Sequence, residues 1–175
     1  MKFIEAHNTD FRNEIIALYL ESFSGGASKQ YIDLEELNQY VDGFFSGGNV
    51  LIAIENNQLI GTLLYCPLKM DNLFPEMIQK NFNIEKCAYI AEIMVAEISR
   101  GQGIGTQLLQ FFFETVDRKY FDDVFIRVWD KNTLALNLYK KTGFNSISSI
   151  HQTKRNPDKK GTFVMQKIYL HRKIV

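Results

Sequence analysis

The sequence predicts one α/β domain that spans residues 1–175. A chain of this length favours a single domain and can bury roughly 70% of its unfolded surface. The composition, 46% hydrophobic and 23% charged, supports a large folded core and argues against disorder. The expected order of elements along the chain is a strand, two helices, three strands, a helix, a strand, a helix and two strands.

The N-terminal segment begins with a predicted edge strand, because residues 2–7 alternate between polar and apolar side chains. Thr9 or Asp10 can then cap a helix, which we expect to extend to Phe23. The apolar residues that this helix should turn toward the core are Phe11, Ile15, Leu18 and Phe23.

A second helix is predicted to begin after Asp33 and to extend to about Phe44. Asp33 can cap it, and Glu36 three residues later completes the pattern of a capping box. Strands follow at residues 50–55 and 59–66, joined by a short polar turn that is typical of a hairpin.

The connection at residues 71–85 shows no sustained periodicity, and one short helix is expected near residues 75–81. It is either an inserted lid or a simple connection. An almost unbroken apolar run at residues 88–95 then predicts a strand buried on both faces of a sheet, with Glu92 as its only charge.

The C-terminal half begins with a predicted helix, because apolar residues recur every three or four positions from Ile104 to about Tyr120. The elements expected after it are a strand at 124–129, a helix at 133–142, and antiparallel strands at 144–151 and 162–172, with a polar loop at 154–161.

Three glycines at alternate positions separate the central strand from the next helix, in the segment Arg100-Gly101-Gln102-Gly103-Ile104-Gly105. Glycine permits positive φ angles and lets another molecule approach the main chain closely. The free N–H groups and positive dipole end of the helix make this turn a candidate phosphate site. The spacing fits neither a Walker loop nor a dinucleotide fingerprint. Taken alone, the motif fits a purely structural turn equally well.

A second motif follows the strand at 124–129. It spans residues 130–144 and contains Asn132, Ala135, Leu138, Tyr139, Gly143 and Phe144. At this separation the two motifs together resemble the GCN5-related N-acetyltransferase (GNAT) superfamily, closely over residues 90–144 and elsewhere by element order. The resemblance implies a mixed, mostly antiparallel central sheet of about seven strands flanked by about four helices. It also implies direct transfer of an acetyl group from acetyl-CoA to a primary amine in a ternary complex.

The resemblance assigns cofactor contacts to both motifs. Backbone N–H groups of the turn would hold the pyrophosphate, Arg100 would add charge, and the central strand would pair with the pantetheine arm. Asn132 would contact that arm or an ordered water, although a helix cap looks identical in sequence. The predicted cofactor residues are Ile93, Val95, Arg100, Gly101, Gln102, Gly103, Gly105, Thr106 and Asn132. Glu97 departs from the family pattern, in which proline is frequent, and places a negative charge near the turn.

Two residues are candidates for proton transfer. Tyr139 matches the family tyrosine that can protonate the departing thiolate, and its alternative is a ring packed in the core. Glu92 is the candidate general base, because burial raises the pKa of a carboxyl group; its alternative is a carboxylate that only pairs or contacts substrate. Strict alternation would place Glu92 on one face of the strand with Ile90 and Met94.

Acids and aromatic residues near the second helix could receive a cationic amine, and the predicted acceptor contacts are Tyr31, Glu35 and Tyr40. Acids at a helix start are also expected for dipole reasons alone. The acceptor is therefore expected to be a small-molecule or peptide amine. The three histidines are scattered through the sequence, so no metal site is predicted.

The remaining expectations concern partners and location. A formal net charge of zero favours neither nucleic acid nor a membrane as partner, and the N-terminal segment has no signal-peptide pattern, so a cytoplasmic protein is expected. A homodimer is compatible with the sequence. Cys66 and Cys87 read as buried free thiols. Two other functions stay open: a non-catalytic acyl-CoA sensor, and a toxin-like enzyme that acetylates aminoacyl-tRNA through basic residues near Lys154.

Overall fold

The computed structural model describes residues 1–7, 9–25 and 28–174. Within these residues, seven strands form one sheet in the order β1-β2-β3-β4-β5-β7-β6. All neighbouring strands are antiparallel except β4 and β5, which are parallel. The strands are β1 (Lys2–Glu5), β2 (Asn49–Glu55), β3 (Gln58–Pro67), β4 (Cys87–Val95), β5 (Asp123–Trp129), β6 (Asn145–Arg155) and β7 (Thr162–Lys173).

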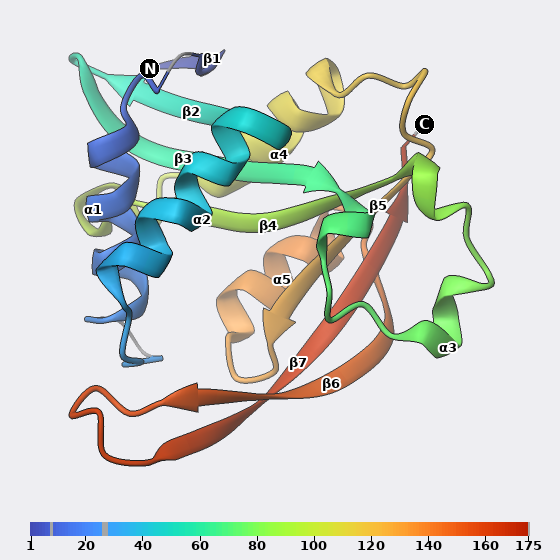
Figure 1. Cartoon of the computed structure of the whole chain (residues 1–175). Coiled ribbons are helices and arrows are strands. Elements are labelled where there is room, and N and C mark those ends of the chain that lie inside the picture. The colour runs from blue at the N-terminus through green and yellow to red at the C-terminus, as the bar shows by residue number, and fades with distance from the viewer. Residues whose placement is uncertain (8, 26–27, 175) are drawn as a thin grey trace.

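Helices cover both faces of this sheet (Figure 1). They are α1 (Arg12–Phe23), α2 (Leu34–Gly47), α3 (Glu76–Gln79), α4 (Ile104–Thr115) and α5 (Thr133–Lys141). The predicted mixed, mostly antiparallel sheet with flanking helices is confirmed, and α3 is a single turn. Among the described residues, no helix combines the length and the apolar character that crossing a membrane would require.

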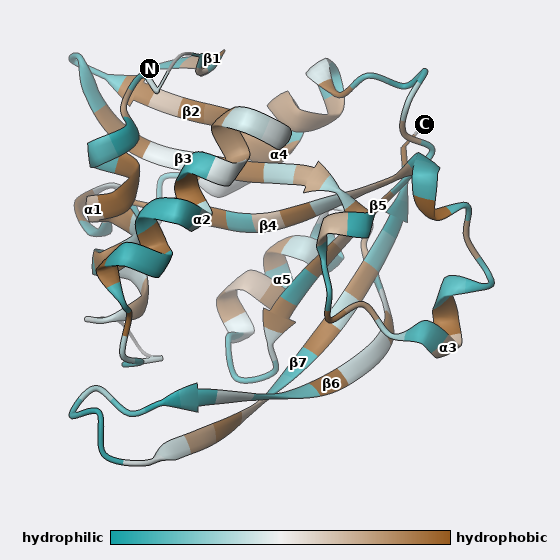
Figure 2. Ribbon diagram, in the orientation of Figure 1, coloured by the Kyte–Doolittle hydropathy of each residue, from teal (hydrophilic) through white to brown (hydrophobic). Residues whose placement is uncertain are grey.

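Two apolar clusters hold these layers together, one on each face of the sheet. Buried residues of α4 and α5, such as Phe112 and Tyr139, pack in the first cluster. Ile15 of α1 and Val41 of α2 pack in the second. Hydrophobic residues accordingly dominate β2, β3 and β4, whereas the far end of the β6–β7 hairpin is hydrophilic (Figure 2).

Three helix boundaries test the sequence prediction. The predicted cap of α1 at Thr9 or Asp10 is wrong, because Phe11 occupies the N-cap position in a left-handed conformation, without a side-chain cap hydrogen bond. The cap of α2 is confirmed, since Asp33 accepts hydrogen bonds from the backbone N–H groups of Glu35 and Glu36. Helix α4 ends at Thr115, five residues before the predicted end, where the chain turns to bury Val116.

The β6–β7 hairpin is longer than predicted. The polar segment expected as a loop at 154–161 belongs partly to the strands, because Lys154 pairs with Phe163 and Arg155 pairs with Thr162. Main-chain hydrogen bonds make this ladder and do not require apolar side chains. Two basic side chains are therefore fixed on a strand.

The connection between β3 and β4 is packed against the sheet. Phe74 lies edge-on to Phe125, with ring centroids 5.0 Å apart. The carboxylate of Asp71 accepts hydrogen bonds from Arg127 at 2.9 Å and from the Tyr169 hydroxyl at 2.6 Å. These buried contacts identify the segment as an anchored connection rather than an open lid.

Two glycines near the end of α2 give a prediction for stability. A Cβ at Gly48 would lie 2.7 Å from the backbone oxygen of Tyr65, so Gly48→Ala must displace main chain. We expect it to lower the free energy of unfolding by about 1–3 kcal/mol. The matched control is Gly43→Ala, where a Cβ meets nothing within 4 Å, and it should stabilise the helix by roughly 0.5–1 kcal/mol. Urea unfolding of both variants checks this, and equal midpoints would contradict it.

Candidate functional site

Strands β4 and β5 separate halfway along their length. Their parallel pairing extends from Cys87↔Asp123 to Ile90↔Ile126, although β4 continues to Val95. Beyond that point β5 stays paired with β7 on its other side. The second half of β4 therefore presents a backbone edge that, among the described residues, has no strand partner on the β5 side.

The open edge of β4 offers specific backbone groups. The N–H of Ala96 donates to the Ile60 oxygen, 3.0 Å away on the β3 side. Because N–H directions alternate along a strand, the N–H groups of Ile93 and Val95 point toward the open edge. Arg100 Nε donates to the Val95 oxygen at 3.1 Å and so lies at this edge. This arrangement fits the predicted pantetheine contacts, which stay a prediction.

A β-bulge lies where the two strands part. On β4, Glu92 pairs with Leu64 of β3, whereas Ile90 pairs with the next residue, Tyr65. Ala91 is thus an extra residue in β4. Such bulges bend a strand and redirect its side chains.

The bulge corrects the predicted alternation along β4. Ile90 does not share a face with Glu92 and Met94. It packs instead in the cluster below α4 and α5, together with Ile93 and Val95. Met94 packs in the opposite cluster. The extra residue therefore redirects Glu92 toward α2, and no period-two pattern can anticipate that shift.

The glycine turn presents a row of free donors. Among the described residues, the backbone N–H groups of residues 101–106 have no hydrogen-bond acceptor. The first helical bond of α4 runs from Gln107 N–H to the Gly103 oxygen at 3.0 Å. Gly101 and Gly103 both adopt φ 78°, a left-handed conformation that favours glycine. The row lies at a helix N-terminus, where the dipole also favours an anion.

Other residues of the turn have different surroundings. A Cβ at Gly105 would lie 3.3 Å from the Leu138 side chain, so this glycine lets α4 and α5 approach each other. Arg100 lies 3.8 Å from Glu21 as a surface ion pair. Glu97 is exposed, and its backbone N–H donates to Glu21 at 2.6 Å. Two carboxylates therefore accompany the one guanidinium beside the turn.

Tyr139 and Asn132 both belong to α5. Tyr139 is 6% exposed, and burial together with the charge of Glu92 raises its pKa. Its hydroxyl therefore stays protonated at neutral pH, and it has no hydrogen-bond partner within the part of the chain that the structure describes. Asn132 caps α5 by accepting a hydrogen bond from Ala135 N–H at 3.1 Å. The cap alternative for Asn132 is confirmed, and its cofactor contact stays a prediction.

Glu92 is half-buried and accepts a hydrogen bond from the Tyr40 hydroxyl at 3.0 Å. Burial raises the pKa of its carboxyl group above the ordinary value, and the Tyr40 hydrogen bond partly opposes that shift. The positive charges of Lys167, Lys154 and Arg127 oppose it as well. A carboxyl group with a raised pKa is better suited to accept a proton near neutral pH.

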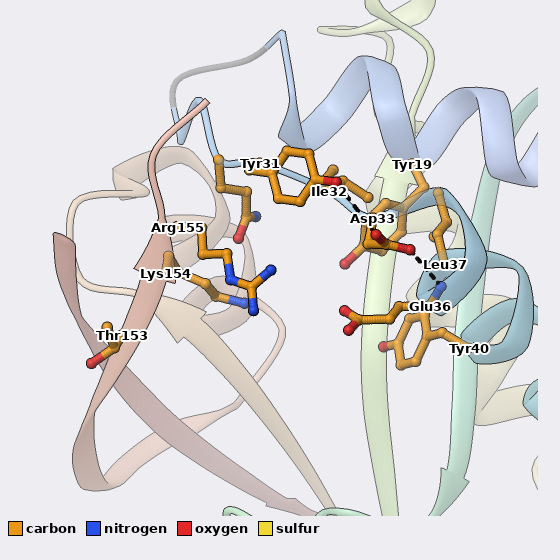
Figure 3. A pocket seen from close by; sticks show the side chains of 11 residues that line it. Tyr19, Tyr31, Ile32, Asp33, Glu36, Leu37, Tyr40, Thr153, Lys154 and Arg155 are labelled. Atoms are coloured by element: carbon orange, nitrogen blue, oxygen red, sulfur yellow. Dashed lines mark hydrogen bonds between the residues drawn. The ribbon is translucent and has the colours of Figure 1, made fainter. Parts of the chain in front are cut away.

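A cavity of about 400 Å³ lies between the first two helices and strand β6. Figure 3 shows its lining side chains. Residues from the helical side include Tyr19, Tyr31, Glu36 and Tyr40, and residues from β6 include Lys154 and Arg155. Tyr40 connects the cavity to Glu92 through its hydroxyl.

The structure places the predicted acceptor residues unequally. Tyr31 and Tyr40 line the cavity, whereas Glu35 does not and Glu36 does. Adjacent helical residues project about 100° apart, which explains the difference. Tyr19, Lys154 and Arg155 were missed as lining residues, because only the sheet topology places β6 opposite α2. The basic residues of this hairpin have different surroundings. Lys154 and Arg155 line the cavity, whereas Lys159 lies over the Tyr31 ring, 4.7 Å from its centroid.

Both cysteines are buried free thiols, as predicted. Cys66 is 3% exposed and Cys87 is fully buried. Burial raises the pKa of each thiol to about 12. Neither forms a thiolate at neutral pH, which argues against a cysteine nucleophile.

Comparison with known sequences identifies relatives of this chain. The sequence model of the acetyltransferase (GNAT) family matches residues 12–144. An N-alpha-acetyltransferase of Sulfurisphaera tokodaii is 30% identical over 118 residues, which cover 67% of this chain and 65% of that protein. GCN5-related N-acetyltransferase 6, chloroplastic, of Arabidopsis thaliana is 34% identical over 77 residues, which cover 44% of this chain but 26% of that protein.

Solved structures share the fold over nearly the whole chain. A ribosomal-protein-alanine N-acetyltransferase of Brucella melitensis superposes with a TM-score of 0.74 at 19% identity and covers 99% of both chains. YncA of Salmonella typhimurium, solved with its cofactor acetyl-CoA, gives a TM-score of 0.74 at 15% identity over 100% of this chain and 94% of its own. Because the family model spans residues 12–144, more than half of the sequence, the chain belongs to the GNAT family of acetyltransferases.

Proposed function

We propose that this protein transfers the acetyl group of acetyl-CoA directly to a primary amine of a small molecule or peptide. The observation that carries the proposal is the open edge of β4, which leads from the free N–H groups of residues 101–106 to Glu92. One end offers an anion site and the other a proton acceptor. Family membership supports the same reaction.

The residues of the turn and of β4 fit the cofactor. The N–H groups of Gln102, Gly103, Gly105 and Thr106 would hold the pyrophosphate, since they have no other acceptor among the described residues. Gly101 leaves open space beside them, and Arg100 lies at the edge where Ile93 and Val95 would pair with the pantetheine arm. When bound, acetyl-CoA supplies the acetyl group as an activated thioester.

Two side chains would move protons. The Glu92 carboxylate would accept a proton from the acceptor amine, directly or through one water. The raised pKa of Tyr139 keeps its hydroxyl protonated before transfer. That hydroxyl would protonate the departing thiolate sulfur, and solvent would return a proton to the tyrosinate afterwards. The buried thiols argue against a covalent acyl-enzyme, so transfer would occur in a ternary complex.

The test combines calorimetry with a thiol-release assay. The protein should bind coenzyme A and release free thiol when acetyl-CoA is mixed with amino acids, polyamines, aminoglycosides or peptides. Gly103→Val should weaken coenzyme A binding about tenfold or more, because a β-branched residue resists φ 78° and moves the donors. Gly43→Ala, remote from the turn, is the control. A folded protein that gives no heat with coenzyme A would overturn the proposal.

A further inference from the structure

The cavity between the helices and β6 carries opposite charges on its two sides. Glu36 projects into it from α2, and Lys154 and Arg155 project into it from β6 (Figure 3). Glu92 lies beyond Tyr40 on the acidic side. A ligand that fills the cavity therefore meets carboxylates at one end and cations at the other.

These charges form no close ion pair among the described residues, although the negative charge of Glu92 attracts Lys154 and Lys167. Lys154, Arg155 and Lys167 form no ion pair with any described residue. Glu36 also has no ion-pair partner among those residues. Burial lowers the pKa of Lys167 to about 8, which is the mark of a cation removed from water without a full counter-charge.

The Gln30 amide is a further polar group in the lining of this cavity. Gln30 is 7% exposed and lines the same cavity. Its side chain has no hydrogen-bond partner among the described residues, although its backbone N–H donates to the Phe23 oxygen. An amide that lines a cavity without a protein partner is free to hydrogen-bond a polar group of a ligand.

Main-chain contacts fix the distance between the two sides. The backbone N–H of Tyr31 donates to the Arg155 oxygen at 3.0 Å and joins the segment before α2 to β6. Asp33 of the same segment is occupied by the α2 cap, so its carboxylate is already hydrogen-bonded. Glu36 is thus the lining carboxylate without a hydrogen-bond donor among the described residues, and Glu92 lies beyond Tyr40, whose hydroxyl donates to it.

We propose that the acceptor is a zwitterion, an amine that also carries a carboxylate, such as a free amino acid or a short peptide. Its amine would lie toward Glu92 and its carboxylate would contact Lys154 and Arg155. A polyamine would be repelled by these two cations, and a neutral monoamine would leave them unpaired. The inference names the substrate class of the proposed acetyl transfer and rests on that function.

Matched acceptors test this inference in the thiol-release assay. Tyrosine, leucine and lysine, and the dipeptides Ala-Tyr and Ala-Leu, are each compared with their C-terminal amides, which lack the carboxylate but keep the reacting amine. We expect kcat/KM to be about tenfold higher for the free acid of the preferred acceptor. Arg155→Gln and Lys154→Gln should each raise its KM about tenfold and leave the KM of its amide within twofold.

The control variant is Lys160→Gln, which removes the same charge from the turn beyond β6, outside the cavity lining. It should leave both acceptor forms unchanged. If the amides react as well as the acids, or if Arg155→Gln weakens both forms equally, the zwitterion is rejected while acetyl transfer stands. If no acceptor releases thiol although coenzyme A binds, the proposed function itself fails, and the inference fails with it.

Discussion

Glu92→Gln is expected to lower kcat by about 100-fold or more while the affinity for coenzyme A stays within about twofold. The glutamine amide has the size of the carboxyl group and can still accept the hydrogen bond from the Tyr40 hydroxyl, but it cannot act as a base. The Glu92 carboxylate accepts its hydrogen bond from Tyr40 of α2 and forms none with the glycine turn among the described residues, so the cofactor site should be unaffected. Steady-state kinetics and calorimetry with coenzyme A check the two halves of this result.

The pH profile distinguishes a base from a structural carboxylate. The wild-type rate should rise with pH as Glu92 loses its proton, and burial places this rise above the pH range of an ordinary glutamate because it raises the pKa. Glu92→Gln should lack the rise. The hydrogen bond from Tyr40 lowers the pKa of Glu92. Tyr40→Phe removes that bond, so it should raise the pKa and move the rise in rate to higher pH. An unchanged rate and profile for Glu92→Gln would show that another group or water removes the proton.

Tyr139→Phe is expected to lower kcat roughly 10- to 100-fold, again with cofactor affinity retained. The ring keeps its packing in the cluster below α5, so the loss is confined to the hydroxyl proton. An acetyl-CoA analogue that keeps the pyrophosphate and pantetheine arm but has a more acidic thiol should reduce the defect, because its thiolate leaves with less need of protonation. Kinetics with the two donors measure this difference.

Tyr120→Phe is the matched control for that experiment. Tyr120 is 68% exposed and lies after α4. Removal of its hydroxyl should therefore leave kcat unchanged with either donor. A Tyr139→Phe enzyme with normal kcat would identify Tyr139 as a core residue alone. If Glu92→Gln and Tyr139→Phe both retained full cellular function, the acyl-CoA sensor would replace the enzyme as the better proposal.

Local sequence patterns predicted most elements of the fold. The apolar run before Val95 and the helical spacing after Ile104 identified the central strand and α4, because burial imposes a period on each. The glycines at 101 and 103 were also informative, since both adopt left-handed φ angles at a helix N-terminus. Errors occurred where the local signal is weak, as at the α1 cap and at the polar end of the β6–β7 hairpin.

The sequence alone determined the order of elements, the glycine turn and the identity of Glu92 and Tyr139 as candidates. Only the tertiary structure decided which groups they meet. The bulge at Ala91 redirects Glu92 toward Tyr40, and the hairpin turns Lys154 and Arg155 toward α2. The physical reason is range: helix and strand periods depend on near neighbours, whereas a cavity and its charges depend on segments about a hundred residues apart that the whole sheet brings together.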